Sequence, residues 1–233
     1  LITTKKGRNG QPAKLTYNSF FGVDTDPGKL NVLNAKEWGE MEWLGQKASV
    51  RGTPGEATFV PSHPSYGNSQ DPVIPEYING DPTMPYDAVT NRLMRSADTD
   101  WYDAVTRPAF GQSHNLGIQG GGENSKYGVS FGYFNREGTL IENSFQRYST
   151  RLNTEFAFLN DHLRIGENIT VAYSENNGNE GFGDARQRYH PLIPVRDDGG
   201  NYGGTLNGIL GLQTNAVNPV ANQVRHKNSI DRR

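Results

Sequence analysis

Apolar and polar side chains alternate along most of the chain between residues 112 and 174. In the stretch 126–136, large apolar side chains occupy one set of alternate positions and mostly small or polar ones the other: Tyr127, Val129, Phe131 and Tyr133 against Gly128, Ser130, Gly132 and Phe134. A period of two is typical of a β-strand with two unlike faces. The pattern predicts strands over about 14–23, 113–119, 126–136, 146–159 and 162–174.

The chemistry of the two faces indicates the kind of sheet that these strands form. The stretch 146–159 again separates aromatic and aliphatic groups from hydroxyl, amide and charged groups: Tyr148, Leu152, Phe156 and Phe158 against Ser149, Arg151, Asn153 and Glu155. A wall with an apolar outside and a polar inside is the pattern of transmembrane β-barrels. We therefore expect an all-β fold, in which an antiparallel sheet forms a segment of a transmembrane β-barrel.

The predicted strands are joined alternately by short and longer connections. Short turns are expected at 120–125 and at Asn160-Asp161, whereas the stretches 25–110 and 175–233 are long. Outer-membrane barrels have short periplasmic turns and longer external loops. We therefore expect 25–110 and 175–233 to be external loops.

The first of these loops contains one clear helix signal. Asn34 followed three residues later by Glu37 is the pattern of a capping box, which predicts a helix from Ala35 to about Lys47. The spacing of apolar residues predicts that this helix packs through Trp38, Met41 and Leu44. The long external loop is therefore partly helical.

Composition narrows the classes of function. Only 33% of the 233 residues are hydrophobic, and no run approaches the roughly 18 apolar residues of a transmembrane helix. A net charge of −2, with both signs mixed, gives no basic surface for nucleic acid. The chain contains no cysteine, which excludes disulfides, thiolate metal sites and cysteine nucleophiles within it.

Both ends of the sequence resemble cut ends. The chain begins at Leu1 without an initiator methionine or a signal peptide, and it stops at Arg233 inside a polar stretch. Five strands cannot close a membrane barrel, because the smallest bacterial barrels use about eight. Unpaired strand edges in hydrocarbon also leave backbone groups without hydrogen bonds. We therefore expect the chain to be a fragment of a longer protein.

Six short motifs spread over nearly the whole chain are similar to one protein family. They are LITTKKG at 1–7, LNAKEW at 33–38, TDWYD at 99–103, HNL at 114–116, RYSTRLN at 147–153 and PLIPV at 191–195. Their combination resembles SusC-like TonB-dependent outer-membrane transporters. The first motif resembles the point at which the plug of such a transporter continues into its barrel, and the second resembles a helix start in its first external loop.

The resemblance implies a location in the cell outer membrane and a barrel of roughly 22 strands around a plug domain. It implies that residues 1–7 end the plug and that residues 8–233 form the first part of the barrel. It also implies nutrient uptake of oligosaccharides or peptides, energised by TonB through a segment absent here. The implied partners are outer-membrane lipid and a SusD-like surface lipoprotein, and no cofactor is implied.

One residue departs from the expected pattern. Glu167 shares a face with Ile165 and Ile169, where a barrel would meet lipid. A carboxylate is costly there at mid-depth and less so near an interface. We expect either a position near the periplasmic rim or a β-bulge that changes the register.

The candidate ligand-binding residues are aromatic side chains of the first loop, Tyr66, Tyr77 and Tyr86. Such rings could stack on a sugar or a peptide, or they could pack the loop or contact a partner. Trp38 and Trp101 are interpreted as structural, because Trp38 lies on the expected helix from Ala35 and Trp101 on a short helix expected over Thr99–Val105.

The sequence gives no pattern typical of catalysis or of a metal site. Glu37, Glu40 and Glu42 are better explained by helix capping than by a glycosidase pair. The five histidines lack metal-ligand spacing, and 197–201 reads as a polar turn rather than a calcium loop. The strand residues Arg151, Asn153, Glu155 and Arg164 are expected to line the lumen or meet the plug.

Two other classes of protein remain open on the sequence alone. A soluble secreted β-sandwich with a carbohydrate-binding role also has alternating strands and aromatic loops, and an extracellular glycan hydrolase is the weaker option. In a sandwich, Phe131, Phe156 and Phe158 would be buried against a second sheet. In a barrel segment, they would be exposed toward lipid.

Overall fold

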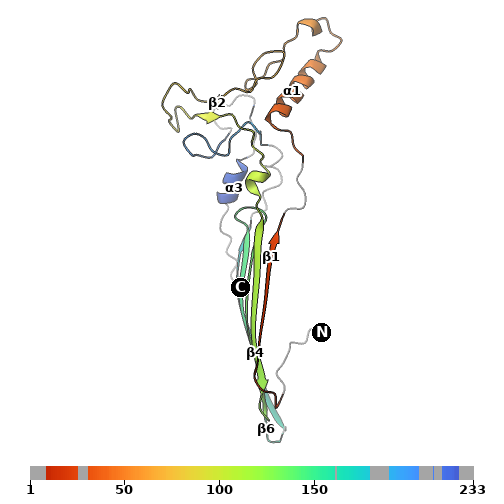
Figure 1. The fold of residues 1–233 in the computed structure, drawn as a ribbon, viewed down its shortest axis with the longest axis vertical. Helices are drawn as coiled ribbons and strands as arrows, with labels where there is room; N and C mark the ends of the chain where they lie inside the picture. The colour runs from red at the N-terminus through yellow and green to blue at the C-terminus, as the bar shows by residue number, and fades with distance from the viewer. Residues whose placement is uncertain are drawn as a thin grey trace. The chain divides into compact units, whose positions relative to one another are not determined.

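The computed structural model describes residues 9–25, 31–160, 162–178, 189–204, 212 and 217–225. These residues form two compact units (Figure 1). The sheet unit comprises the described residues of 9–25 and 107–178, and the loop domain comprises those of 31–106 and 189–225. The expected plug segment 1–7 lies outside the described residues.

The sheet unit is one five-stranded antiparallel sheet with the strand order β1-β4-β5-β6-β7 (Figure 1). Its strands are β1 (Lys14–Asp24), β4 (Ala109–Gly121), β5 (Ser125–Glu137), β6 (Ser144–Phe158) and β7 (Leu163–Asn177). The five expected strands are thereby confirmed. Strand β4 begins four residues earlier than expected because Ala109 pairs with Asp24 at the end of β1.

The turn between β6 and β7 differs by one residue from the expected one. Leu159 and Asn160 both have positive φ, 53° and 54°, as in the type I′ turns that match strand twist. Asp161, the second residue of the expected turn pair, lies outside the described residues. Leu159 therefore holds a backbone position that asparagine or glycine usually occupies.

The loop domain contains short elements around a separate core. They are α1 (Ala35–Ser49), the 3₁₀ turns η1 (Glu56–Thr58) and η2 (Asp103–Val105), the strands β2 (Tyr77–Asn79) and β3 (Met94–Arg95), and α3 (Pro219–Arg225). The capping box of α1 is confirmed: Asn34 Oδ1 accepts from Glu37 N at 2.8 Å, and Glu37 Oε2 accepts from Asn34 N at 3.0 Å.

The predicted packing face of α1 is correct for Trp38, which packs against the core, and wrong for Met41 and Leu44. Met41 and Leu44 are exposed by 53% and 61%, whereas the helix buries Ala35, Gly39 and Trp43. Gly39 explains this choice, because a Cβ there would lie 2.6 Å from the Tyr66 ring. The absence of a side chain lets Tyr66 pack directly on the helix, and this contact determines which face is buried.

The core of the loop domain draws on both long connections of the sequence. It consists of Ala35, Trp43, Tyr66, Met94, Trp101, Tyr189, Leu192, Ile193 and Leu212. The stretches 25–110 and 175–233, expected as two separate loops, therefore contribute to one folded domain.

Candidate functional site

The apolar face of the sheet is continuous across all five strands. The register places Tyr17, Leu116, Phe131, Thr150 and Val171 in one row, and Leu15, Ile118, Val129, Leu152 and Ile169 in the next. Phe131, Phe156 and Phe158 are exposed by 50%, 46% and 48%. These are the side chains that a sandwich would bury, so the sheet matches the barrel expectation.

A row in which four of the five side chains carry rings crosses this face beside the aliphatic rows. The row is Ser19, His114, Tyr133, Tyr148 and Tyr173. The His114 ring lies 6.0 Å from that of Tyr133, which lies 5.1 Å from that of Tyr148. His114 Nδ1 and the Tyr17 hydroxyl are 2.6 Å apart. Amphipathic rings at the edge of an apolar band are typical of membrane interfaces.

Glu167 lies on the apolar face, opposite Thr154. The bulge offered as one explanation is absent, because the β6–β7 register is unbroken from Ser144↔Asn177 to Phe158↔Leu163. Glu167 is exposed and lies four residues from the first residue of β7. The rim position stays a prediction.

The opposite face of the sheet is mostly polar, as expected, although Phe20, Phe134 and Phe145 also lie on it. The register puts Arg151, Asn153, Glu155 and Arg164 on it. Lys126 Nζ lies 2.7 Å from Glu155 Oε1. The Oδ1 atom of Asn153 is buried and has no hydrogen-bond partner among the described residues. It borders a surface hollow that Thr16, Ser130 and Arg151 also line. This face therefore offers polar groups to a further polar surface.

Tyr66 packs the loop domain and has no exposed surface for a ligand. It is fully buried, and its hydroxyl donates to the Ala35 carbonyl at 2.5 Å. Burial, and secondly the nearby Asp98 carboxylate, raise the pKa of Tyr66. The packing roles expected for Trp38 and Trp101 are confirmed: Trp38 stacks on Tyr66 at 5.7 Å, and Trp101 is buried.

The other two candidate tyrosines are half-buried and engaged in polar contacts. The Arg95 guanidinium lies 4.6 Å from the centre of the Tyr77 ring and donates to its hydroxyl. The Tyr86 hydroxyl accepts from Asn201 Nδ2 at 2.6 Å and donates to Asp197 Oδ2 at 3.3 Å. Tyr77 and Tyr86 are thus fixed in orientation, and neither residue is fully buried.

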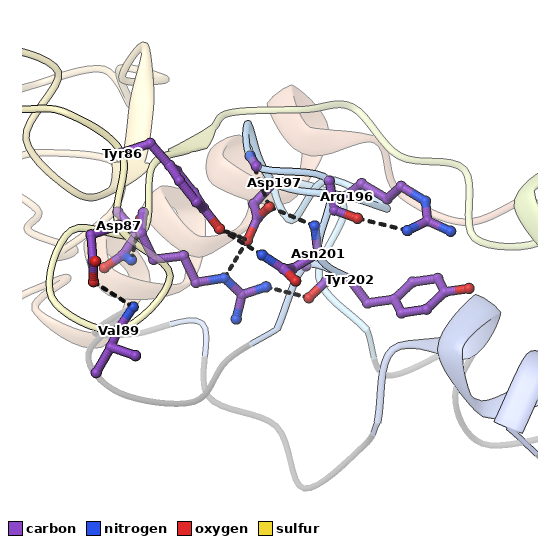
Figure 2. A network of polar contacts seen from close by, with 12 residues as sticks. Tyr86, Asp87, Val89, Arg196, Asp197, Asn201 and Tyr202 are labelled. Carbon is purple, nitrogen blue, oxygen red and sulfur yellow. Dashed lines mark hydrogen bonds and ion pairs between the residues drawn. The ribbon is translucent and has the colours of Figure 1, made fainter.

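Asp197 is the centre of a polar network that the sequence did not predict (Figure 2). Its Oδ2 accepts from Arg92 Nε at 2.5 Å. Its Oδ1 accepts from the Gly199 and Asn201 amides at 3.1 and 2.8 Å. Arg92 also donates to the Tyr202 carbonyl. These contacts explain the calcium-like sequence as a turn built around one buried carboxylate.

A second buried polar group of the loop domain is His190. Its Nδ1 accepts from the Leu192 amide at 3.1 Å, and its ring lies 4.2 Å from that of Trp38. Burial, and secondly His63, lower the pKa of His190 to about 4. Burial raises the pKa of neighbouring Tyr189 to about 12, with Arg92 opposing the change. Both groups are therefore neutral at ordinary pH.

The described part of the chain holds neither a cluster of metal-ligating side chains nor a membrane-spanning helix. Its His, Asp and Glu side chains form no group of three or more that could hold a metal ion. None of the described helices has both the length and the apolar composition needed to cross a membrane.

The sheet, with one exposed apolar face and one polar face, defines a segment of a transmembrane β-barrel wall. No protein-family model matches the chain. The TonB-dependent receptor SusC of Bacteroides thetaiotaomicron is 27% identical over 176 residues, which are 76% of this chain and 14% of the receptor. The TonB-dependent receptor P26 of Formosa agariphila is 30% identical over 235 aligned residues, covering 100% of this chain and 20% of the receptor.

Solved structures show the same fold. The RagAB peptide importer matches with a TM-score of 0.53 and 21% identity in its open-open state, and 0.51 and 22% in its closed-closed state. Each match covers 85% of this chain and 22% of the solved chain. The chain is thus homologous to TonB-dependent receptors, SusC among them, and spans about a fifth or less of their length. The expected relationship and outer-membrane location are confirmed.

Proposed function

We propose that the chain is the first part of the barrel, with its adjoining loops, of an outer-membrane importer of oligosaccharides or peptides. The observation that carries the proposal is homology along the whole chain to a TonB-dependent receptor, combined with a sheet whose apolar face is exposed. That face is suited to lipid, because its aliphatic rows adjoin a row of aromatic rings. A SusD-like surface lipoprotein would complete the importer.

The polar face of the sheet is proposed to hold the plug. Residues 1–7 would end the plug and residues 8–233 would belong to the barrel. The unpaired Asn153 Oδ1 and the Lys126–Glu155 pair supply the polar groups that such a contact needs. TonB would act on a segment outside this chain.

The loop domain is proposed to contact the ligand through Tyr77 and Tyr86. Each ring is held by neighbouring polar groups and half-buried, which leaves a fixed aromatic surface for stacking. Homologues of this chain are named receptors. We propose that the chain takes part in binding and passage of the ligand without catalysing a reaction.

Deletion of the gene in its host tests the function. Uptake of fluorescent oligosaccharide and peptide mixtures would be measured in the deletion strain, in the complemented strain and in a strain lacking TonB. We expect one mixture to lose uptake in both mutant strains and to regain it on complementation. Unchanged uptake of both mixtures, together with a purified receptor that stays monodisperse without detergent, would refute the proposal.

A further inference from the structure

Two parts of the loop domain, far apart in the sequence, are joined by a continuous seam. We call residues 31–106 the first loop segment and residues 189–204 the second. The Ala97 and Thr99 amides donate to the Leu192 and Pro191 carbonyls at 3.0 and 2.8 Å. Further along, Trp101 Nε1 donates to the His190 carbonyl at 3.1 Å. These three hydrogen bonds all run from the first segment to backbone carbonyls of the second.

The seam is closed by apolar packing on one side. Leu192 and Ile193 of the second segment are fully buried in a core whose other members include Met94 and Trp101 of the first. The Tyr189 ring meets the Trp101 ring edge-on at 4.7 Å. Separation of the segments would expose this shared apolar core to water. Loops that move independently have few buried apolar contacts, so this seam differs from them.

The Arg92–Asp197 pair joins the two segments at another point. The Asp197 side chain is 0% exposed and that of Arg92 is 22% exposed. Tyr86 and Asn201 add a second contact between the segments beside this pair. Pulling the segments apart would leave a buried carboxylate without its counter-ion, which proteins strongly disfavour.

We infer that the two loop segments form a single rigid body, fastened by Arg92 and Asp197, which moves as one piece during uptake. The inference rests on the proposed function, because it describes how the loops of the importer behave. It excludes a gate in which the two segments part from each other to admit the ligand. Motion within the importer must then occur elsewhere than at this seam.

A cross-link between the segments tests the inference in the full-length importer. The Asp198 amide donates to the Leu93 carbonyl at 3.2 Å. Leu93 is half-buried and Asp198 is exposed, so L93C and D198C place two thiols on hydrogen-bonded neighbours across the seam. Cells carrying both substitutions would be oxidised, and uptake would be compared before and after reduction. The 233 residues contain no other cysteine to compete.

The controls separate cross-linking from local damage. Each single variant reports the effect of its substitution alone. The pair R196C and Y202C joins two bridged positions inside the second segment, so it adds a disulfide without crossing the seam. We expect the L93C–D198C disulfide to form readily and uptake to stay within about twofold of both controls.

Three results would overturn the inference. They are loss of uptake that returns on reduction, failure of the L93C–D198C disulfide to form while the R196C–Y202C disulfide forms, and independent exchange of the two segments. The last result is measured by hydrogen exchange of the purified receptor. If the segments form one body, R92Q should raise the amide exchange rates of both segments together, by about tenfold or more. Because disulfide formation and exchange need no transport, absent uptake in the wild type would refute the proposed function alone.

Discussion

Two buried polar residues of the loop domain show how the surroundings of a side chain determine whether it is paired or held neutral. Asp197 is paired with Arg92 and accepts hydrogen bonds from two backbone amides. His190 is instead held neutral, because burial and the nearby His63 disfavour its charged form. The stability of the domain therefore depends on one charge that is present and one that is absent.

Replacing Arg92 by methionine should destabilise the Asp197 turn strongly. The variant would leave a buried carboxylate unpaired, at a cost of about 3 kcal/mol. Hydrogen exchange at the Gly199 and Asn201 amides, which donate to Asp197, measures this cost. The double variant R92M/D197N should recover part of it, because the amide keeps an acceptor and carries no charge. An R92M effect below about 0.5 kcal/mol would show that the pair contributes little.

The stability of the loop domain should depend on pH through His190. An unfolded histidine titrates near pH 6.5, whereas the pKa of His190 in the folded domain is about 4. Between these values the unfolded chain binds more protons, so stability is fully present above about pH 6.5 and falls as the pH drops toward 4.

Tryptophan fluorescence during denaturation of the purified receptor at pH 4 to 7 checks this dependence. The variant H190N keeps an acceptor for the Leu192 amide and removes the titrating ring. It should flatten the pH profile. A variant profile as steep as that of the wild type would assign the pH dependence to another residue.

At the scale of elements, α1 shows which parts of a helix are local and which are not. Its beginning is fixed by Asn34 and Glu37, which are neighbours in sequence, so the capping box could be predicted. Its buried face depends on Tyr66, which lies 27 residues beyond Gly39 in the sequence and packs where a glycine leaves room. No periodicity within the helix contains that information.

The cap itself should be worth about 1 kcal/mol. Replacing Asn34 by alanine removes the acceptor for the Glu37 amide and should raise hydrogen exchange in the first turn of α1 accordingly. N34S retains a capping hydroxyl and serves as the control. Equal exchange in both variants would mean that other contacts, such as that of Asp98 with the Ala35 amide, hold the helix start.

The two faces of β7 provide a matched pair of substitutions. Val171 lies on the apolar face and adjacent Thr170 on the polar face, and both are exposed. An arginine at 171 would face hydrocarbon, at a cost of about 2–4 kcal/mol, whereas one at 170 would face the polar interior. We expect V171R to reduce the folded receptor in the outer membrane far more than T170R, as seen by heat-modifiable migration on gels. Similar losses in both variants would argue against a lipid-facing side.

The sheet was more predictable than the loop domain for a physical reason. Each strand carries its own two-residue period, so the face of Phe131 follows from its immediate neighbours. Asp197 lies 105 residues from Arg92 in the sequence, and no local pattern indicates that they meet. For the same reason Tyr66, Tyr77 and Tyr86 looked equivalent in the sequence, although only Tyr66 is in the core.

At the level of the whole receptor, the chain supplies a five-stranded part of the barrel wall and the loop domain. It spans 14–20% of SusC and P26, and we expect further strands of the full receptor to pair with β1 and β7. In hydrocarbon these edges need partners, because unpaired backbone groups there are costly. Ligand capture, plug movement and energy coupling would then depend on how this arc works with the remainder of the receptor.

As part of a membrane wall, this sheet would present the face of Phe131 to lipid. A single-cysteine scan of 127–134 in the full-length receptor, labelled in intact outer membranes, tests this orientation most directly. Odd-numbered positions should react with a lipid-soluble maleimide and resist a charged one, while the even-numbered positions between them should show the opposite preference. Uniform labelling by the charged reagent, or protection of the odd-numbered positions from both reagents, would contradict this orientation.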